Sequence, residues 1–161
     1  MEALEAIRKR RSVRKFTGAV VPREDIEKIV NAARLAATGS NQQPWDFIAV
    51  TDPKMIERLT VVGKWMRQAG VIIAVVVDPA SRWWVEDGSA AIENMLVAST
   101  ALGYGSCWVE GDALPLEGEF KALLSIPKEK RLLALIPVGV PEEWPEIKKR
   151  PLENVLHWEI Y

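Results

Sequence analysis

The residues best suited to chemistry lie in one basic run near the N-terminus. Six of the eight residues from Arg8 to Lys15 are arginine or lysine. Arginines along an extended segment, with the Ser12 hydroxyl between them, can hold a phosphate through forked N–H donors and one hydroxyl. A solvated helix end and a nucleic-acid patch are the two other interpretations that such a run allows.

Two further polar segments could complete an anion site. Lys148, Lys149 and Arg150 form a second basic cluster near the opposite end of the chain. If both ends converge, their cations would neutralise a phosphate dianion from two sides. The segment from Thr38 to Gln43 supplies hydroxyls and amides, which suit a polyol or the edge of a heterocycle, although an ordinary polar turn has the same composition.

The usual devices of protein-based catalysis are missing from the sequence. The single cysteine, Cys107, and the single histidine, His157, exclude a disulfide framework and argue against a His-rich metal site. Gly103 and Gly105 lack the third glycine of a dinucleotide fingerprint, and no P-loop or nucleophile elbow occurs. Because no acid–base or nucleophilic group stands out, an enzyme with this sequence would take its reactive atoms from a cofactor.

Length and composition indicate one folded domain over residues 1–161. The chain is 48% hydrophobic and 27% charged, with a formal net charge of −1. A domain of this size buries about 69% of its surface, and a near-neutral charge argues against a whole-protein polyanion binder. The N-terminus has no apolar leader, and the longest apolar run is far shorter than the ~20 residues of a membrane span. We therefore expect a cytoplasmic protein that binds neither membranes nor nucleic acid.

Helices and strands that alternate along the chain must position the polar segments. Hydrophobic periodicity predicts helices at 2–11, from 22 to the stop at Gly39, and at 53–62, 85–102 and 120–124, and strands at 47–51, 71–77, 106–109 and 132–140. Pro137 indicates that the last strand lies at an edge or contains a bulge. Such alternation by itself favours a parallel α/β sheet.

Two segments have surfaces that call for a packing partner. The predicted helix 85–102 is rich in small residues, which allow close approach of another helix from the same chain or from a second subunit. The tail 141–161 contains three prolines but also Trp144, Leu152 and Trp158. Because a solvated tail would not expose so much apolar surface, we expect it to pack on its own domain or on a partner.

Taken in order, four motifs resemble the FMN-dependent nitroreductase family, of which this chain looks like a short member. They are RRSVRKF at 10–16, SNQQPWDF at 40–47, LGYGSCW at 102–108, and KKRPLENV at 148–155 with His157 and Trp158. The resemblance implies an α+β sandwich whose central, mostly antiparallel sheet is flanked by helices. It also implies an intertwined homodimer with FMN at the subunit interface and the tail 141–161 extending over the partner.

The resemblance assigns a place around the flavin to individual residues. Phosphate and ribityl contacts would come from Arg10, Arg11, Ser12, Lys148 and Arg150. Contacts from the other subunit would come from Thr38, Ser40, Asn41 and Gln43. Arg14 would lie near the pyrimidine edge, where a cation stabilises the negative charge of the reduced ring. The backbone N–H groups of Glu110 and Gly111 would face flavin N5 and O4.

The implied activity is a ping-pong reaction in which the flavin carries the chemistry. NADH or NADPH passes a hydride to flavin N5 and leaves, and a nitroaromatic, quinone or similar electron-poor acceptor takes its place. Trp65, Trp83 and Trp84 are candidates for the walls of the acceptor pocket. The alternatives are a flavin enzyme of the same fold that reduces enones, removes halogens or breaks down flavin, and a non-catalytic nucleotide- or RNA-binding module.

Overall fold

A four-stranded antiparallel sheet forms the centre of the computed structural model, which describes residues 1–161. Its strands lie in the order β1 (Trp45–Val50), β2 (Val71–Val77), β4 (Arg131–Gly139) and β3 (Gly105–Ser106), and each neighbouring pair is antiparallel. The expected α+β fold with an antiparallel sheet is therefore confirmed. The parallel sheet suggested by alternation alone is wrong, because alternation does not determine at which end of the sheet the chain re-enters.

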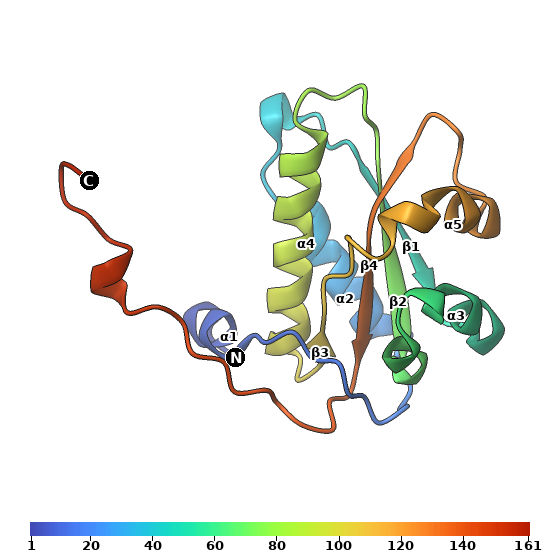
Figure 1. Cartoon of the computed structure of the whole chain (residues 1–161), viewed down its shortest axis with the longest axis horizontal. Helices are drawn as coiled ribbons and strands as arrows, with labels where there is room; N and C mark the ends of the chain where they lie inside the picture. Colours follow the sequence, from blue (N-terminus) through green and yellow to red (C-terminus); the bar gives the residue numbers. More distant parts are fainter.

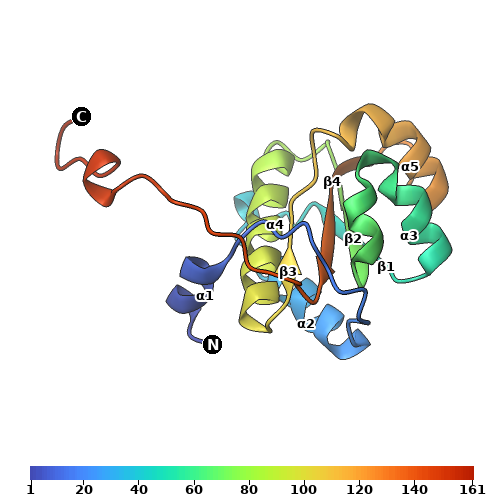
Figure 2. The ribbon, with the colours of Figure 1, turned by 60° about the horizontal axis from the view of Figure 1, so that its bottom comes forward.

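Helices cover both faces of this sheet. α2 (Arg23–Arg34) and α4 (Trp84–Ala101) lie on one face, and α3 (Pro53–Leu59) and α5 (Glu117–Leu124) lie on the other (Figures 1 and 2). β2 is buried along its whole length between these layers. Its odd-numbered residues join the core beneath α2 and α4, and its even-numbered residues join the core beneath α3 and α5. The period of two that a strand imposes thus divides one apolar run between two cores.

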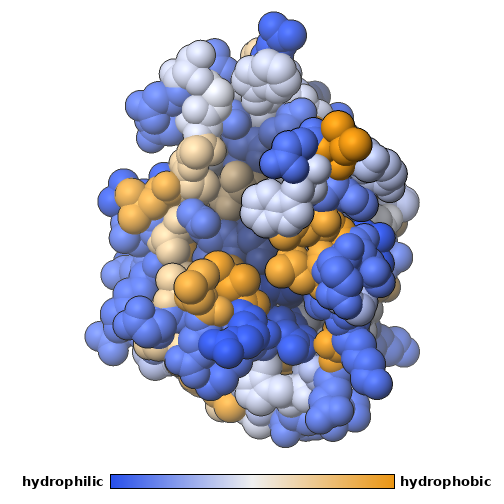
Figure 3. Space-filling model, turned by 90° about the vertical axis from the view of Figure 1, so that its left-hand side faces the viewer, coloured by the Kyte–Doolittle hydropathy of each residue, from blue (hydrophilic) through white to orange (hydrophobic).

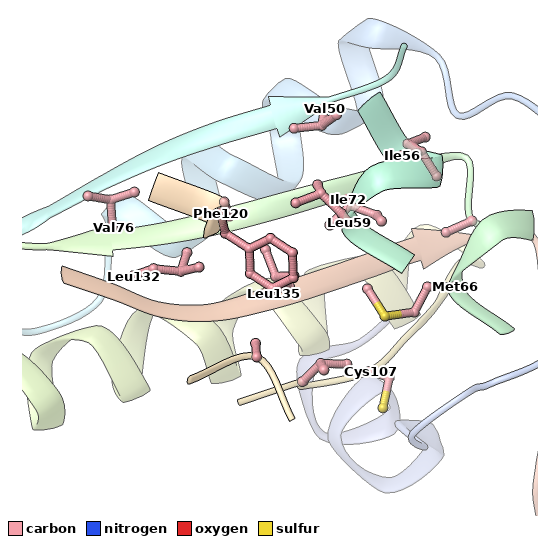
Figure 4. Packing of buried hydrophobic residues seen from close by; sticks show 14 of the residues in the cluster. Val50, Ile56, Leu59, Met66, Ile72, Val76, Cys107, Phe120, Leu132 and Leu135 are labelled. Carbon is pink, nitrogen blue, oxygen red and sulfur yellow. The ribbon is translucent and has the colours of Figure 1, made fainter. Parts of the chain in front are cut away.

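The core beneath α3 and α5 is shown in Figure 4. Phe120 from α5 reaches toward Leu132 and Leu135 of β4, and Leu59 from α3 lies beside Ile72 of β2. All five side chains are almost fully buried. This packing fixes β4, against which the segment after β3 is aligned.

Pro137 does not mark an edge or a bulge. β4 lies between β2 and β3, and its bulge is at Leu133, where the register with β2 shifts. The Pro137 carbonyl accepts the Cys107 N–H at 3.2 Å, so this side of Pro137 faces the segment after β3. Regular pairing there is only two residues long, so the missing proline N–H interrupts no continuous ladder.

Several elements are shorter than the periodicity predicts. The first helix, α1 (Ala3–Lys9), ends before Arg10, and α2 ends at Arg34, well before Gly39. The third helix ends at Leu59 and continues as a 3₁₀ turn over residues 60–62. The strand predicted at 106–109 reduces to β3 and an isolated bridge from Val109 to β4.

The two ends of the chain run side by side next to β3. Ser12 forms a parallel bridge with Ser106, and Phe16 forms an antiparallel bridge with Pro141. The Thr17 N–H also donates to the Val140 carbonyl at 3.0 Å. The basic run and the start of the tail are therefore neighbours in space.

The tail leaves the folded body and projects away from it (Figure 1). Every residue from 151 to 161 is exposed, including Trp158 and Ile160 at 74% and 82%. Apart from a 3₁₀ turn at Leu152–Asn154, it has no regular structure. None of the helices combines the length and the apolar character needed to cross a bilayer.

Candidate functional site

The basic run is held in an extended form by β3. Its Val13 N–H donates to the Ser106 carbonyl at 2.9 Å, and the Val13 side chain is fully buried. A Cβ atom on Gly105 would lie 2.7–2.8 Å from three side-chain atoms of Val13, so only glycine permits this approach. With Val13 pointing inward, its neighbours Ser12 and Arg14 retain access to solvent.

Arg10 and Arg11 make contacts within the protein. The Arg10 Nε atom lies 3.3 Å from the Glu93 carboxylate on α4. Arg11 Nη1 donates to the carbonyls of Arg8 and Arg10, at 2.7 Å each, and so satisfies acceptors at the C-terminal end of α1. These bonds orient both guanidinium groups without neutralising the charge of Arg11.

A pocket of about 820 Å³ joins the basic run to the tail. Its lining includes the cationic side chains Arg8, Lys9, Arg11 and Lys148, together with Trp144. The structure thus brings Lys148 to the N-terminal cations, as convergence of the chain ends requires. The side of the molecule that bears α1 and the tail is seen in Figure 3, where hydrophobic patches are interspersed with mostly hydrophilic side chains. Arg150 is exposed and does not line this pocket.

Arg14 lies against an aromatic pair. Its guanidinium carbon is 5.9 Å from the Trp65 ring centroid, and Trp65 stacks on Phe16 with centroids 6.3 Å apart. A cation over an indole face is attracted by the ring quadrupole, which restrains the arginine side chain. Trp65 therefore supports the basic run, while Trp83 and Trp84 lie at the start of α4.

Cys107 lies beside this run but is poorly suited to act as a nucleophile. It is 2% exposed, and burial raises the pKa of its thiol although the nearby Arg14 opposes the shift. A raised pKa leaves little thiolate at neutral pH. At neutral pH the Cys107 thiol is therefore mostly protonated and poorly nucleophilic.

The turn after Val109 offers two unused backbone donors. The N–H groups of Glu110 and Gly111 donate to no acceptor in the protein, whereas the Glu110 carbonyl accepts from Ala113 and Leu114 at 2.9 Å each. A Cβ atom on Gly111 would meet nothing within 4 Å, so the turn is open on that side. Glu110 comes four positions after Ser106, the bridge partner of Ser12, and four steps of extended chain span about 13 Å.

The polar loop 38–43 has an unusual backbone. Ser40, Asn41 and Gln43 have φ angles of 51°, 55° and 50°, which non-glycine residues rarely adopt. The Thr38 hydroxyl accepts the Gln43 N–H at 3.3 Å and closes the loop. The side chains of Ser40, Asn41 and Gln43 are exposed, so they are available to a ligand.

Within one protomer the loop and the basic run lie at opposite ends of α4. The Gly39 N–H donates to Asp87 near the start of α4. Thr100, near the end of α4, lines the pocket that joins the basic run to the tail. Thirteen residues of helix correspond to about 20 Å. Figure 1 shows the same separation, with the turn at 39–41 beside one end of α4 and α1 beside the other. The structure does not bring these two predicted parts of the site together in a single chain.

Asp87 and Glu93 were not predicted as part of the site. Acidic residues in the first turn of a helix are common, because they complement the helix dipole, and an acidic residue within a helix is usually a solvated group. Only their contacts with Gly39 and Arg10 distinguish them.

Comparisons with known proteins agree with this architecture. The model of the nitroreductase family matches residues 7–62 and 60–140. A relative from Archaeoglobus fulgidus, provisionally named NADH dehydrogenase/NAD(P)H nitroreductase, is 38% identical over 153 residues, which cover 88% of this chain and 87% of the relative. A solved structure with the same provisional name, from Bacteroides thetaiotaomicron, has a TM-score of 0.90 at 29% identity and covers 99% of this chain and 98% of its own.

More distant matches keep the fold. The structure of a nitroreductase with bound FMN from Bacteroides fragilis has a TM-score of 0.84 at 24% identity, and each chain is covered completely. Iodotyrosine deiodinase 1 of Mus musculus is 26% identical, over 96% of this chain and 68% of the relative. The family match extends over most of the chain, and the resemblance found in the four motifs is confirmed. This protein belongs to the nitroreductase family.

Proposed function

We propose that the protein is an FMN-dependent oxidoreductase that takes electrons from NADH or NADPH and reduces nitroaromatics, quinones or similar electron-poor acceptors. The observation that carries this proposal is the meeting of Lys148 with the N-terminal cations in one pocket. The relative named as an NAD(P)H nitroreductase and the FMN-bound neighbour support it.

The residues present suit a flavin mononucleotide. Arg11 and Lys148, which line the pocket, would supply positive charge for its phosphate, and the neighbouring Arg10 and Ser12, which do not line it, would add a guanidinium group and a hydroxyl. The Ser106 hydroxyl next to Ser12 is buried without a partner, as expected where a polar ligand group completes the hydrogen bonding. When bound, the flavin supplies the reversible two-electron chemistry that no side chain here provides.

Two features would orient and polarise the ring. Arg14, which Trp65 restrains, would offer a positive charge to the ring and so stabilise the negative charge that develops on reduction. The free N–H groups of Glu110 and Gly111 would donate to the ring without adding an acid or a base. The chain thus contributes positioning and electrostatics, and solvent supplies the protons.

We further propose that a second copy of the chain completes the site. α4 presents small, half-buried side chains along one face, among them Ala90, Val97 and Ala98. In a twofold dimer, two α4 helices packed antiparallel place the start of one beside the end of the other. Loop 38–43 of one subunit would then meet the basic run of its partner, which accounts for their separation within one chain.

A visible spectrum followed by anaerobic titration tests the proposal. The purified protein is expected to be yellow and to bleach when NADH or NADPH is added without oxygen. A colourless protein whose polyanion binding falls steeply with salt would instead support the nucleotide- or RNA-binding alternative.

The cationic pocket is tested by removing one cation from each end of the chain. Arg11→Ala combined with Lys148→Ala, which removes two cations that line the pocket, is expected to weaken FMN binding about 100-fold, because charge-assisted bonds to phosphate are lost. The control, Arg23→Ala combined with Arg34→Ala, removes the same charge from the exposed face of α2. Equal flavin content after dialysis of the two double variants would refute this site.

Reductive dehalogenation is a second candidate activity. The similarity to iodotyrosine deiodinase 1 over nearly the whole chain favours it. Both activities would use the same flavin contacts. The residues that line the acceptor pocket above the ring would decide between them. Release of iodide from iodotyrosine by the reduced protein, measured beside reduction of a nitroaromatic, separates the two activities.

A further inference from the structure

Asp87 is the only charged residue that the structure buries. It lies in the first turn of α4 and is 5% exposed. No cation pairs with its carboxylate. Burying a charge is costly unless the group is paired or well hydrogen-bonded, so the position needs an explanation.

Helix capping does not explain this burial. The side chain makes no bond to the N–H groups at the start of α4. Instead, Oδ1 accepts the Gly39 N–H at 3.0 Å, from a residue 48 positions earlier in the chain. The other carboxylate oxygen, Oδ2, is buried and has no partner in the protein. The one hydrogen bond that the Asp87 carboxylate makes therefore connects α4 to loop 38–43.

The loop is held at the same place by a second contact. A Cβ atom on Gly39 would lie 2.2 Å from Cδ1 of Trp83, so the indole covers this glycine closely. Three of the four residues that follow Gly39, namely Ser40, Asn41 and Gln43, have positive φ angles. Unfavourable backbone conformations of this kind persist only where the surroundings fix them, and Asp87 and Trp83 supply that fixation.

We propose that Asp87 is a positioning residue that holds loop 38–43 in the conformation that binds flavin. This inference rests on the proposed function, in which Thr38, Ser40, Asn41 and Gln43 contact FMN bound to the partner subunit. Asp87 touches no reacting atom in this scheme. It acts through the Gly39 N–H, whose direction sets the path of the residues that follow.

Substitution of Asp87 tests the proposal. The Kd for FMN is measured by titrating the apoprotein with FMN and recording the quenching of flavin fluorescence. Asp87→Ala removes the acceptor for Gly39 and is expected to raise the Kd for FMN about 10- to 100-fold, since a hydrogen bond to a charged group is lost. Asp87→Asn keeps an acceptor and is expected to stay within about threefold of the wild type. Glu86→Gln, an exposed neighbour on α4, is the matched control and should not change the Kd.

A merely structural role predicts another pattern. The Tm of the apoprotein would then fall in Asp87→Ala, while its Kd for FMN, measured well below that Tm, would equal the wild-type value. That result would overturn the proposal, as would equal weakening of FMN binding by Asp87→Asn and Asp87→Ala.

Gly39→Ala provides a second route that leaves the carboxylate in place. The added methyl group would overlap the Trp83 indole, so the loop or the indole that covers it must move, and the Kd for FMN is expected to rise as in Asp87→Ala. If Asp87→Ala does not fold, this variant decides: an unchanged Kd overturns the inference. Failure of the wild-type protein to bind FMN would contradict the proposed function itself and, with it, this role of Asp87.

Discussion

Arg11 combines a structural contact with a place in the candidate site. One guanidinium nitrogen donates to two carbonyls at the end of α1, and the side chain also lines the pocket that contains Lys148. A ligand phosphate would therefore be held by a group whose direction is already set by the helix end. Such preorganisation reduces the entropy that binding must overcome.

Cys107 shows how burial suppresses reactivity within a cationic setting. Burial raises the pKa of its thiol, and the opposing effect of Arg14 is smaller. We expect a disulfide reagent to modify Cys107 roughly 100-fold more slowly in the folded protein than in the unfolded protein. In the folded state the reagent reaches the thiol less easily, and a smaller fraction of the thiol is ionised. The absorbance of the released thiolate at pH 8, with and without guanidinium chloride, measures the two rates.

Since the chain has no other cysteine, a Cys107→Ser variant gives the background of this assay. Equal rates in the folded and unfolded states would show that the thiol is accessible, contrary to its burial.

Among the elements, β3 has the greatest influence on the site for its size. Its two residues align the basic run through the Ser12–Ser106 bridge, and they pair with β4 on the other side. The close contact between Gly105 and Val13 keeps the basic run against the sheet. A regular strand in the middle of the sheet, β2, is thus less directly involved than this short edge strand.

Gly105→Ala should therefore displace the basic run. The methyl group would overlap Val13, and we expect a loss of about 1–3 kcal/mol in the free energy of unfolding, as for other overpacked sites. Denaturant titration of the apoprotein measures this loss, and FMN binding should weaken in the same variant.

Gly118→Ala is the matched control on α5. A Cβ atom there meets nothing within 4 Å, so the substitution is expected to stabilise the protein by about 0.5–1 kcal/mol through helix propensity. If both glycine variants were as stable as the wild type, the steric argument for Gly105 would be wrong.

For the molecule as a whole, the tail is the segment with the least support from its own chain. Residues 151–161 are exposed throughout, and none belongs to either hydrophobic core. Apolar side chains such as Trp158 and Ile160 are favoured by burial, which a second copy would provide. The tail is therefore proposed to stabilise the dimer and not the fold of one subunit.

Deletion of residues 151–161 distinguishes these roles. We expect the truncated protein to fold, since no core residue is lost, but to become monomeric and to release FMN. Light scattering gives the oligomeric state, circular dichroism the folding, and absorbance the flavin content. A truncated protein that remained dimeric and yellow would refute the proposed role of the tail.

Local pattern was sufficient for the elements whose character depends on their own residues. The β-branched run at 71–77 coincides with β2, and the predicted helix 85–102 differs from α4 by one residue at each end. The four motifs identified the family, and the two basic clusters pointed to a shared anion site. Composition and periodicity carry this information because they are properties of consecutive residues.

Tertiary structure decided how those elements face one another. It determined that the strands are antiparallel, that Pro137 lies inside the sheet, and that the loop 38–43 and the basic run lie at opposite ends of α4. It also showed that Asp87 is buried against Gly39 and that Lys148 reaches the N-terminal cations. These features depend on contacts between residues far apart in the chain, whose free energies are set by which surfaces meet and not by any local pattern.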